Sequence, residues 1–244
     1  MESKKLFEKY RLGDLELANR IVMAPMTRSR AIGNLPNDII AEYYGQRAGA
    51  GLIITEGTSP SPNGLGYARI PGIFSDEQTE AWKKVTSEVH SKGSKIFVQL
   101  MHTGRVSSSE NLPAGAICLA PSPVKLEGTI WADASGMVEH DTPKEMSSDE
   151  IESTKQEYVE AAKNAIKAGF DGVELHGANG YLLEQFLSPH TNRRVDEFGG
   201  NIEKRCRFVI DVANEVSSAI GKERTGIRLS PYGAANGMPV YPEI

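Results

Sequence analysis

Short apolar segments alternate with amphipathic segments of helical length along this chain, and that alternation restricts the possible folds more than composition does. Strands separated by helices lie side by side in a parallel sheet, because each helix carries the chain back to the edge at which the next strand starts. The sequence therefore predicts an α/β fold built on a parallel sheet. Strands are predicted at residues 21–24, 52–55, 95–100, 171–175 and 225–229.

Capping residues mark where the intervening helices begin. Ser147 and Glu150 have the spacing of a capping box, and Asp76 and Asn201 are each expected to cap a further helix. A short hairpin is expected across Gly13, ahead of the first core strand. Helices are predicted at about 38–48, 76–92, 147–167 and 201–220. In the last helix the inward positions are expected to be Ile202, Phe208, Val209, Val212 and Val216.

The common nucleotide-binding motifs do not follow any predicted strand, since the chain has neither GxGxxG nor GxxxxGK[ST]. A (β/α)8 TIM-type barrel is therefore the better interpretation, and such a barrel takes ~250 residues. The fifth predicted strand already ends at residue 229, so residues 1–244 are expected to hold one incomplete barrel domain with about the first five βα units. Residues 103–146 are rich in Pro and Gly and are expected to form a loop or lid within it.

Polar side chains are predicted where the strands end, namely Thr27, Glu56, Gln99, His176 and Arg228. In a parallel barrel the carboxyl ends of all strands meet on one face, and the active sites of barrel enzymes lie there. One chemically capable side chain at each strand end therefore predicts a site on that face.

The stretch 169–201 holds the densest group of such residues, and its predicted strand breaks at His176 into a turn. His176 and Asn179 can both donate hydrogen bonds toward one oxygen, which would polarise a carbonyl or nitro group and stabilise the charge that develops there. Tyr181 has a phenolic proton and could act as general acid toward an electron-poor alkene. The alternative is a histidine satisfied by backbone groups beside a packed tyrosine.

Other strand-end residues allow more than one interpretation. Arg228 is either a salt-bridged core arginine or a cation beside a delocalised anion, and Gln99 offers an amide at the same level. Glu56 could pair with Arg228 or ligate a metal. A metal set of His102, Glu56 and His176 has no i, i+4 ligand spacing, so no metal site is predicted.

Charge and composition argue against several classes of partner. The net charge is −5 with both signs interspersed, and no basic stripe indicates a nucleic-acid surface. No apolar run approaches the ~18 residues that cross a bilayer, and residues 1–10 are not followed by the apolar segment of a signal peptide. Cys118 and Cys206 form neither a disulfide framework nor a CxxC motif. A cytoplasmic protein acting on a small molecule is therefore expected.

Six segments, in order and over essentially the whole chain, resemble the old yellow enzyme family of FMN-dependent ene-reductases. They are RIVMAPMTRSR at 20–30, GLIITEGT at 51–58, GYARIPGI at 66–73, FVQLMHTGR at 97–105, DGVELHGANGYLLEQFLSPHTNRRVDEFGGN at 171–201 and GIRLSP at 226–231. The similarity looks greatest to the bacterial branch that reduces nitroesters, maleimides and enones. Thr27 supports that placement, because another branch carries Cys there.

The resemblance implies FMN as cofactor and NADPH or NADH as reductant. Arg228 would face the N1/O2 edge of the flavin and stabilise the anionic reduced ring, while Thr27 would lie near a ring carbonyl oxygen. The residues implied to lie along the ring or to contact its pyrimidine side are Ala24, Pro25, Met26, Thr27, Gly57 and Gln99.

The resemblance also implies roles on the substrate side. His176 and Asn179 would bind the activating oxygen of an α,β-unsaturated carbonyl, maleimide, nitro compound or nitroester. Tyr181 would deliver a proton to Cα after flavin N5 gives hydride to Cβ. Tyr67 would line the substrate pocket. Met101 stands where relatives often have Trp, so the pocket is expected to be roomier there.

The family uses the C-terminal third of its barrel for the FMN phosphate, and that third is not expected within these 244 residues. One hypothesis is a working ene-reductase whose remaining strands come from a complementing chain or from the rest of a longer protein. Another is a catalytically inactive truncated fragment that self-associates through an open strand edge. An unrelated hydrolase or lyase using Glu56 and His176 is disfavoured, because neither a strand-end lysine nor a spaced metal set accompanies them.

Overall fold

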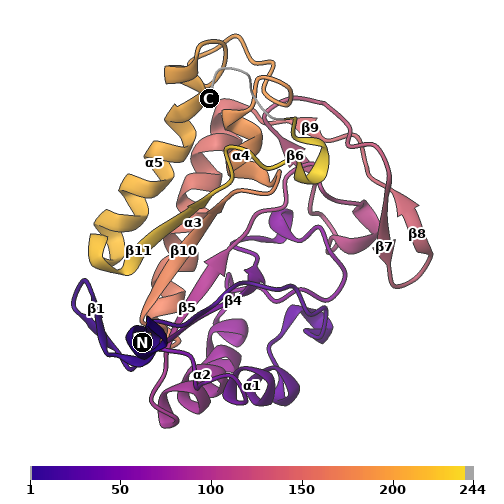
Figure 1. The fold of residues 1–244 in the computed structure, drawn as a ribbon. Helices are drawn as coiled ribbons and strands as arrows, with labels where there is room; N and C mark the ends of the chain where they lie inside the picture. The colour runs from indigo at the N-terminus through magenta and orange to yellow at the C-terminus, as the bar shows by residue number, and fades with distance from the viewer. Residues whose placement is uncertain (1, 240–244) are drawn as a thin grey trace.

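The computed structural model describes residues 2–239 and is built around one five-stranded sheet (Figure 1). Its strands pair in parallel in the order β11–β10–β5–β4–β3. The predicted α/β class with a parallel sheet is therefore confirmed. The strands are β3 Val22–Met23, β4 Leu52–Thr58, β5 Lys95–Leu100, β10 Gly172–Gly177 and β11 Thr225–Leu229.

Helices between these strands pack on one face of the sheet and bury a continuous apolar core against it (Figure 1). Burying one phenylalanine fully contributes roughly 1.5–3 kcal/mol, so each large buried side chain adds measurably to the stability of the core. The largest buried side chains include Trp82, Tyr44, Tyr158, Phe186 and Phe208. The helices are α1 Asp38–Gly45, α2 Asp76–Ser91, α3 Ser148–Lys167, α4 Leu182–Leu187 and α5 Ile202–Ile220.

The start of α2 differs from the prediction, because its cap is Ser75 and not Asp76. The Ser75 hydroxyl accepts a hydrogen bond from the backbone N–H of Gln78, and the Gln78 side chain accepts one from the N–H of Ser75. Asp76 lies inside the first turn and pairs with Lys167 on α3. Both residue types cap helices well, so sequence alone did not distinguish them. The other predicted caps, Ser147 with Glu150 and Asn201, are confirmed.

The fourth core strand is longer than predicted. β10 extends through His176 and Gly177, which pair with Arg228 and Leu229 of β11. His176 is therefore a strand residue and the turn begins after it. The short helix α4 that follows Tyr181 was not predicted, because six residues are too few to show a helical period.

Residues 103–146 contain no α-helix, as predicted, but they do contain small strands. That residues 103–146 form a loop or lid stays a prediction, and so does the assignment of residues 1–244 to a single domain. Two short pairings give this segment its form: β7 Thr129–Ala132 with β8 Gly136–Glu139 in antiparallel, and β6 Leu119–Ala120 with β9 Lys144–Glu145 in parallel. The predicted N-terminal hairpin is confirmed as β1 Tyr10–Leu12 and β2 Leu15–Leu17.

β11 is an edge strand of the described sheet, since only β10 pairs with it. Ile227 and Leu229 on β11 are 41% and 55% exposed. Ile202, which was predicted to face inward, is 64% exposed, so that prediction is wrong. It helps to line an apolar cavity of about 550 Å³ that also includes Leu229 and Cys206. The reason is that no described element covers α5 and β11 on this side.

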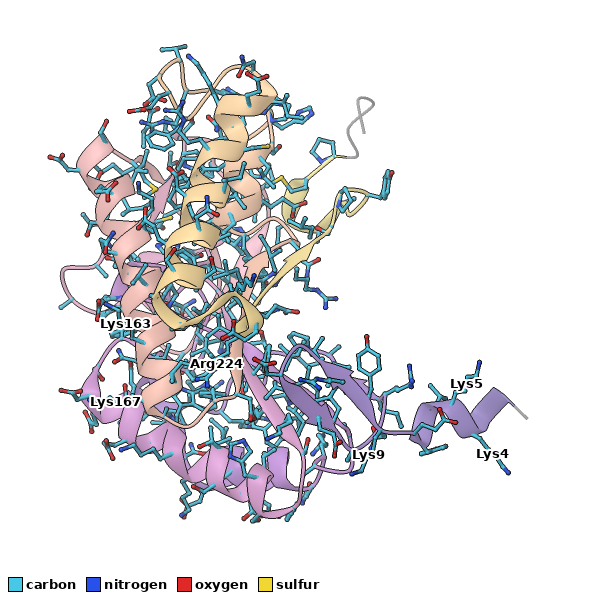
Figure 2. All side chains as sticks on the ribbon, turned by 90° about the vertical axis from the view of Figure 1, so that its left-hand side faces the viewer. Lys4, Lys5, Lys9, Lys163, Lys167 and Arg224 are labelled. Atoms are coloured by element: carbon cyan, nitrogen blue, oxygen red, sulfur yellow. The ribbon has the colours of Figure 1, made fainter. Side chains whose placement is uncertain are left out.

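Surface charges are mostly paired locally. Lys167 on α3 pairs with Asp76, and Lys163 pairs with Glu160 one turn earlier on the same helix (Figure 2). Lys4 lies on the N-terminal turn, which projects away from the rest of the chain (Figure 2). No helix within residues 2–239 is long and apolar enough to cross a membrane.

Candidate active site

A small cavity of about 110 Å³ lies at the carboxyl end of the parallel strands. Its wall is formed by the segment after β3, by β4, β5, β10 and β11, and by the turn after β10. Every residue that lines it was predicted from the sequence as a site residue: Pro25, Thr27, Gly57, Gln99, Met101, His176, Asn179, Tyr181 and Arg228. The other predicted site residues, Ala24, Met26 and Tyr67, do not line it.

Strand register explains why these residues meet. His176 of β10 stands opposite Arg228 of β11, and Gln99 of β5 stands opposite Gly57 of β4. A bulge between Ile54 and Gly57 shifts the register of β4 just before the cavity. Bulges of this kind re-aim a strand end and are common beside active sites. Residues far apart in sequence thereby share one wall.

His176 is buried, with 4% of its surface exposed, and its Nδ1 has no hydrogen-bond partner within residues 2–239. Burial, with a smaller effect from the Arg228 guanidinium, lowers the pKa of His176 to about 3. The ring is therefore neutral near pH 7 and carries a single N–H. A backbone-satisfied histidine, the alternative considered from the sequence, is not observed at Nδ1. Unpaired buried ring nitrogens are rare, which favours a ligand-binding role.

Tyr181 retains its proton at neutral pH, since the ordinary pKa of a tyrosine phenol is about 10 and burial raises the pKa of Tyr181 further. Its hydroxyl lies 3.1 Å from the hydroxyl of Tyr67. Its ring meets the ring of His176 edge to face, with centroids 4.8 Å apart. Tyr67 therefore reaches the site through Tyr181 and does not line the enclosed cavity.

Asn179 has a left-handed backbone conformation with φ of 57°, which asparagine tolerates better than most residues. Its N–H donates to Ser230 Oγ at 2.9 Å, and its carbonyl accepts from Asn236 Nδ2 at 2.7 Å. Sequence analysis missed both partners, because residues after the fifth strand show no helical or strand period. Their turn-forming composition was the one signal available.

Glu174 is another residue that sequence analysis missed. Its Oε1 accepts a hydrogen bond from Gln99 Nε2 at 2.8 Å, which orients the Gln99 amide. Burial raises the pKa of Glu174, while the Gln99 hydrogen bond and the Arg228 charge act in the opposite direction. Glu174 precedes His176 by two positions on β10, so both lie on one face of the strand. That alternation was a usable signal.

Arg228 is exposed, and none of the ion pairs within residues 2–239 includes it. A salt bridge to Glu56, one of the alternatives considered from the sequence, is therefore not formed. Glu56 instead accepts hydrogen bonds from the Arg28 N–H at 3.0 Å and the Tyr44 hydroxyl at 3.4 Å. Burial raises the pKa of Glu56 to about 7. Arg228 is left as a cation open toward the cavity.

Met101 is almost fully buried beside Gly57, where an added Cβ would fall 2.4 Å from the Met101 sulfur. The absence of a side chain at Gly57 therefore makes room for Met101 at the cavity wall. His102, next in the chain, does not line the cavity, and its Nδ1 accepts the Gly104 N–H at 3.1 Å. No group of His, Cys, Asp or Glu within residues 2–239 is arranged to hold a metal ion.

The model of the NADH:flavin oxidoreductase / NADH oxidase family matches residues 5–241 of the chain. The chain belongs to this family. The resemblance to old yellow enzymes seen in the sequence is thereby confirmed, and the family is FMN-dependent.

Curated relatives within the family include 12-oxophytodienoate reductase 1 from Oryza sativa subsp. japonica, 46% identical over 228 residues. Flavin oxidoreductase hxnT from Emericella nidulans is 46% identical over 238 residues. Each alignment covers 93% of this chain and 59% of the relative. The chain therefore spans about three fifths of the length of these family members.

Solved structures agree with the fold. The old yellow enzyme homologue from Zymomonas mobilis superimposes with a TM-score of 0.92 at 46% identity, covering 96% of this chain and 66% of that one. Morphinone reductase also gives a TM-score of 0.92, at 44% identity, and the superposition covers 97% of this chain and 65% of that one. Another structure of morphinone reductase, in complex with tetrahydroNAD, gives 0.92 at 45% identity. The curled parallel sheet thus corresponds to part of an old yellow enzyme barrel.

The cavity residues fit the ring of a flavin. Arg228 and the Gln99 amide together suit the electron-rich edge of a heterocycle that becomes anionic on reduction. The enclosed volume of about 110 Å³ is smaller than the ~300–1,000 Å³ typical of ligand pockets. However, Thr27, which lines the cavity, and its neighbours Ala24 and Met26, which do not, are all exposed. The strand-end face therefore continues outside the enclosed part and is open to a planar group.

Proposed function

We propose that this chain carries the ring-binding and substrate-binding half of the active site of an ene-reductase. An enzyme of this kind reduces activated alkenes and oxidises NADPH or NADH. The substrate class is α,β-unsaturated carbonyls, maleimides, nitro compounds or nitroesters. When bound, FMN supplies the two-electron redox chemistry that links the nicotinamide to the alkene. The observation that carries the proposal is the convergence of His176, Asn179 and Tyr181 with Arg228 in one cavity.

His176 and Asn179 bind the activating oxygen of the substrate in this proposal. The neutral imidazole N–H and the side-chain amide are both donors, and both line the cavity. Donors aimed at an oxygen that gains negative charge stabilise the transition state more than the ground state. A neutral histidine serves this role without giving up its proton to the substrate.

Tyr181 donates the proton that the reduced alkene needs at Cα. Its raised pKa keeps the phenol protonated, and Tyr67 accepts or donates a hydrogen bond at its oxygen. A positioned general acid of this kind contributes typically ~10²–10⁴-fold to a rate. The mostly buried position of Tyr181 limits competing proton exchange with water.

The residues on the ring side hold and orient the cofactor. Arg228 offsets the negative charge of the reduced ring, and Gln99, oriented by Glu174, offers its amide oxygen. The residues proposed to lie along the ring or its pyrimidine side are Ala24, Pro25, Met26, Thr27, Gly57 and Gln99. Tyr67 and Met101 complete the substrate pocket.

A direct test is to purify the chain with excess FMN and record its absorbance, its FMN stoichiometry and its NAD(P)H-dependent reduction of N-ethylmaleimide. Stoichiometric FMN with maleimide turnover supports the proposal. A chain that binds FMN yet reduces no alkene, either alone or after mixing with a separately produced C-terminal third of a relative, contradicts it.

The second candidate is that the chain alone is inactive and self-associates, or works only with a complementing chain that supplies further strands. Two observations favour it: the chain spans 59% of the relatives' length, and the β11 edge carries exposed Ile227 and Leu229. Adding a separately produced C-terminal third of a relative distinguishes the cases. Activity that appears only after mixing supports complementation, whereas large oligomers without FMN support the inactive form.

A further inference from the structure

The turn that presents Asn179 depends on side chains from elsewhere in the fold. Asn179 and Gly180 both have positive φ, at 57° and 78°. A non-glycine residue in this conformation costs of order 1–3 kcal/mol unless its surroundings hold it there. The two N–H groups of the turn point outside any strand ladder or helix, so they need other acceptors.

Glu184 and Ser230 provide those acceptors. The Gly180 N–H donates to Glu184 Oε2 at 2.6 Å, and the Asn179 N–H donates to Ser230 Oγ at 2.9 Å. Ser230 in turn donates its hydroxyl proton to the Glu184 carboxylate, at 3.0 Å from Oε1 and 3.2 Å from Oε2. The two side chains and the two backbone amides thus form one closed set of hydrogen bonds.

The carboxylate of Glu184 stands in an unusual environment for a charge. The residue is 4% exposed, and none of the ion pairs within residues 2–239 includes it. Glu184 and Arg205 both line the apolar cavity of about 550 Å³. The Arg205 guanidinium, however, donates to the carbonyls of Leu187 and Gly200. Burying a carboxylate without a cation is unfavourable, but removing it would leave the buried Gly180 N–H without its acceptor. The carboxylate therefore serves its amide and hydroxyl partners.

Ser230 also connects the two sides of the site. It follows β11 directly, two residues after Arg228, while the Asn179 turn follows β10. A hydrogen bond between them fixes the position of the oxygen-binding turn relative to the strand that carries the ring-side cation. Of the two amides of this turn, Gly180 donates directly to the Glu184 carboxylate, and Asn179 is connected to that carboxylate through the Ser230 hydroxyl.

We propose that Glu184 and Ser230 are positioning residues that hold the Asn179 turn, so that the Asn179 side chain faces the same cavity as His176. This inference rests on the proposed oxygen-binding role of that pair. It predicts that loss of either side chain weakens binding of an oxygen ligand without weakening binding of FMN.

The test uses the FMN-loaded chain and p-hydroxybenzaldehyde as an oxygen ligand, with affinity measured by difference absorbance. Ser230→Ala and Glu184→Leu should weaken that affinity at least fivefold, while Ser230→Thr, which keeps the hydroxyl, should restore most of it. His176→Ala is the positive control. Ser218→Ala and Glu160→Gln are matched controls on exposed helix positions, and FMN affinity and melting temperature are recorded for all variants. Amide hydrogen exchange at Asn179 and Gly180 is measured in parallel.

Each outcome decides the inference. Faster exchange at both amides together with weaker aldehyde binding, at unchanged FMN affinity, supports it. Unchanged aldehyde affinity in Ser230→Ala overturns it, as does an equal loss of FMN and aldehyde binding. If the unsubstituted chain binds no aldehyde, the proposed function fails, and exchange alone decides the positioning role. Unchanged exchange in Ser230→Ala then overturns it.

Discussion

At the scale of single residues, the site depends on which protonation state each side chain holds. Burial keeps His176 neutral, and Tyr181 stays protonated, which are the states that the proposed oxygen-binding and proton-donor roles require. Burial decides the state of His176, because its ordinary pKa lies close to neutral pH, whereas an exposed tyrosine would also be protonated there.

Replacing Tyr181 with phenylalanine removes the proton while keeping the ring. We expect alkene reduction by the FMN-loaded protein to slow by about 10²–10⁴-fold, with reduction of the flavin by NAD(P)H nearly unchanged. Stopped-flow absorbance of the two half-reactions measures each rate separately. Tyr10→Phe, remote and exposed, serves as the control. Equal losses in both half-reactions would contradict the proton-donor role.

Glu56 gives a prediction about stability. Its pKa is raised from 4.5 to about 7, so the folded chain binds more protons than the unfolded chain between these values. The contribution of Glu56 to the free energy of unfolding is therefore fully present below pH 4.5 and is lost as pH rises through 7. Between these values the free energy of unfolding falls by about 1.4 kcal/mol per pH unit. Urea unfolding of wild type and Glu56→Gln at pH 5 and pH 8 isolates this effect. The stability of Glu56→Gln relative to wild type should be greater at pH 8 than at pH 5. An equal difference in stability at the two pH values would contradict a raised pKa of Glu56.

At the scale of elements, helix starts and strand register position the site. Register sets His176 against Arg228, and α2 supports β5, which carries Gln99 and Met101 at its end.

The structure identifies Ser75 as the cap of α2. Ser75→Ala should lower the free energy of unfolding by about 1 kcal/mol, because an N3 amide loses its acceptor. Asp76→Ala should have a smaller effect, and denaturant unfolding of both compares them. A larger loss of unfolding free energy in Asp76→Ala than in Ser75→Ala would indicate that Asp76 caps the helix, as predicted from the sequence.

At the scale of the whole molecule, the β11 edge of the described sheet is the surface through which we expect copies of the chain to associate. β11 presents unpaired backbone groups together with Ile227 and Leu229, the pattern that promotes strand addition. Leu229→Lys should shift the chain toward monomer in light scattering, since a charge on an edge strand opposes pairing. Val195→Lys, at a position that is 96% exposed on a loop, is the matched control. An unchanged mass distribution in Leu229→Lys would show that association does not use this edge.

The sequence by itself determined the alternation of strands and helices, the parallel class of the sheet and the residues that line the cavity. The alternation, the sheet class and the polar residues of the cavity follow from local signals, because apolar period, glycines and strand-end polar residues report on their own neighbourhood. Pro25, Gly57 and Met101 were instead implied by the family resemblance. The HGANGY segment also indicated a donor pair and an acid before any contact was known. Family membership then confirmed the fold that the resemblance implied.

Only the tertiary structure decided which side chains meet across elements. Glu56 accepts a hydrogen bond from Tyr44 and does not pair with Arg228. Glu174 accepts a hydrogen bond from the Gln99 amide. Ser230 and Glu184 came to hold the Asn179 turn. Such pairings depend on strand register and on how loops return to the sheet, and both are set by packing over the whole chain. Local sequence carries no record of that packing, so it predicted the members of the site better than their partners.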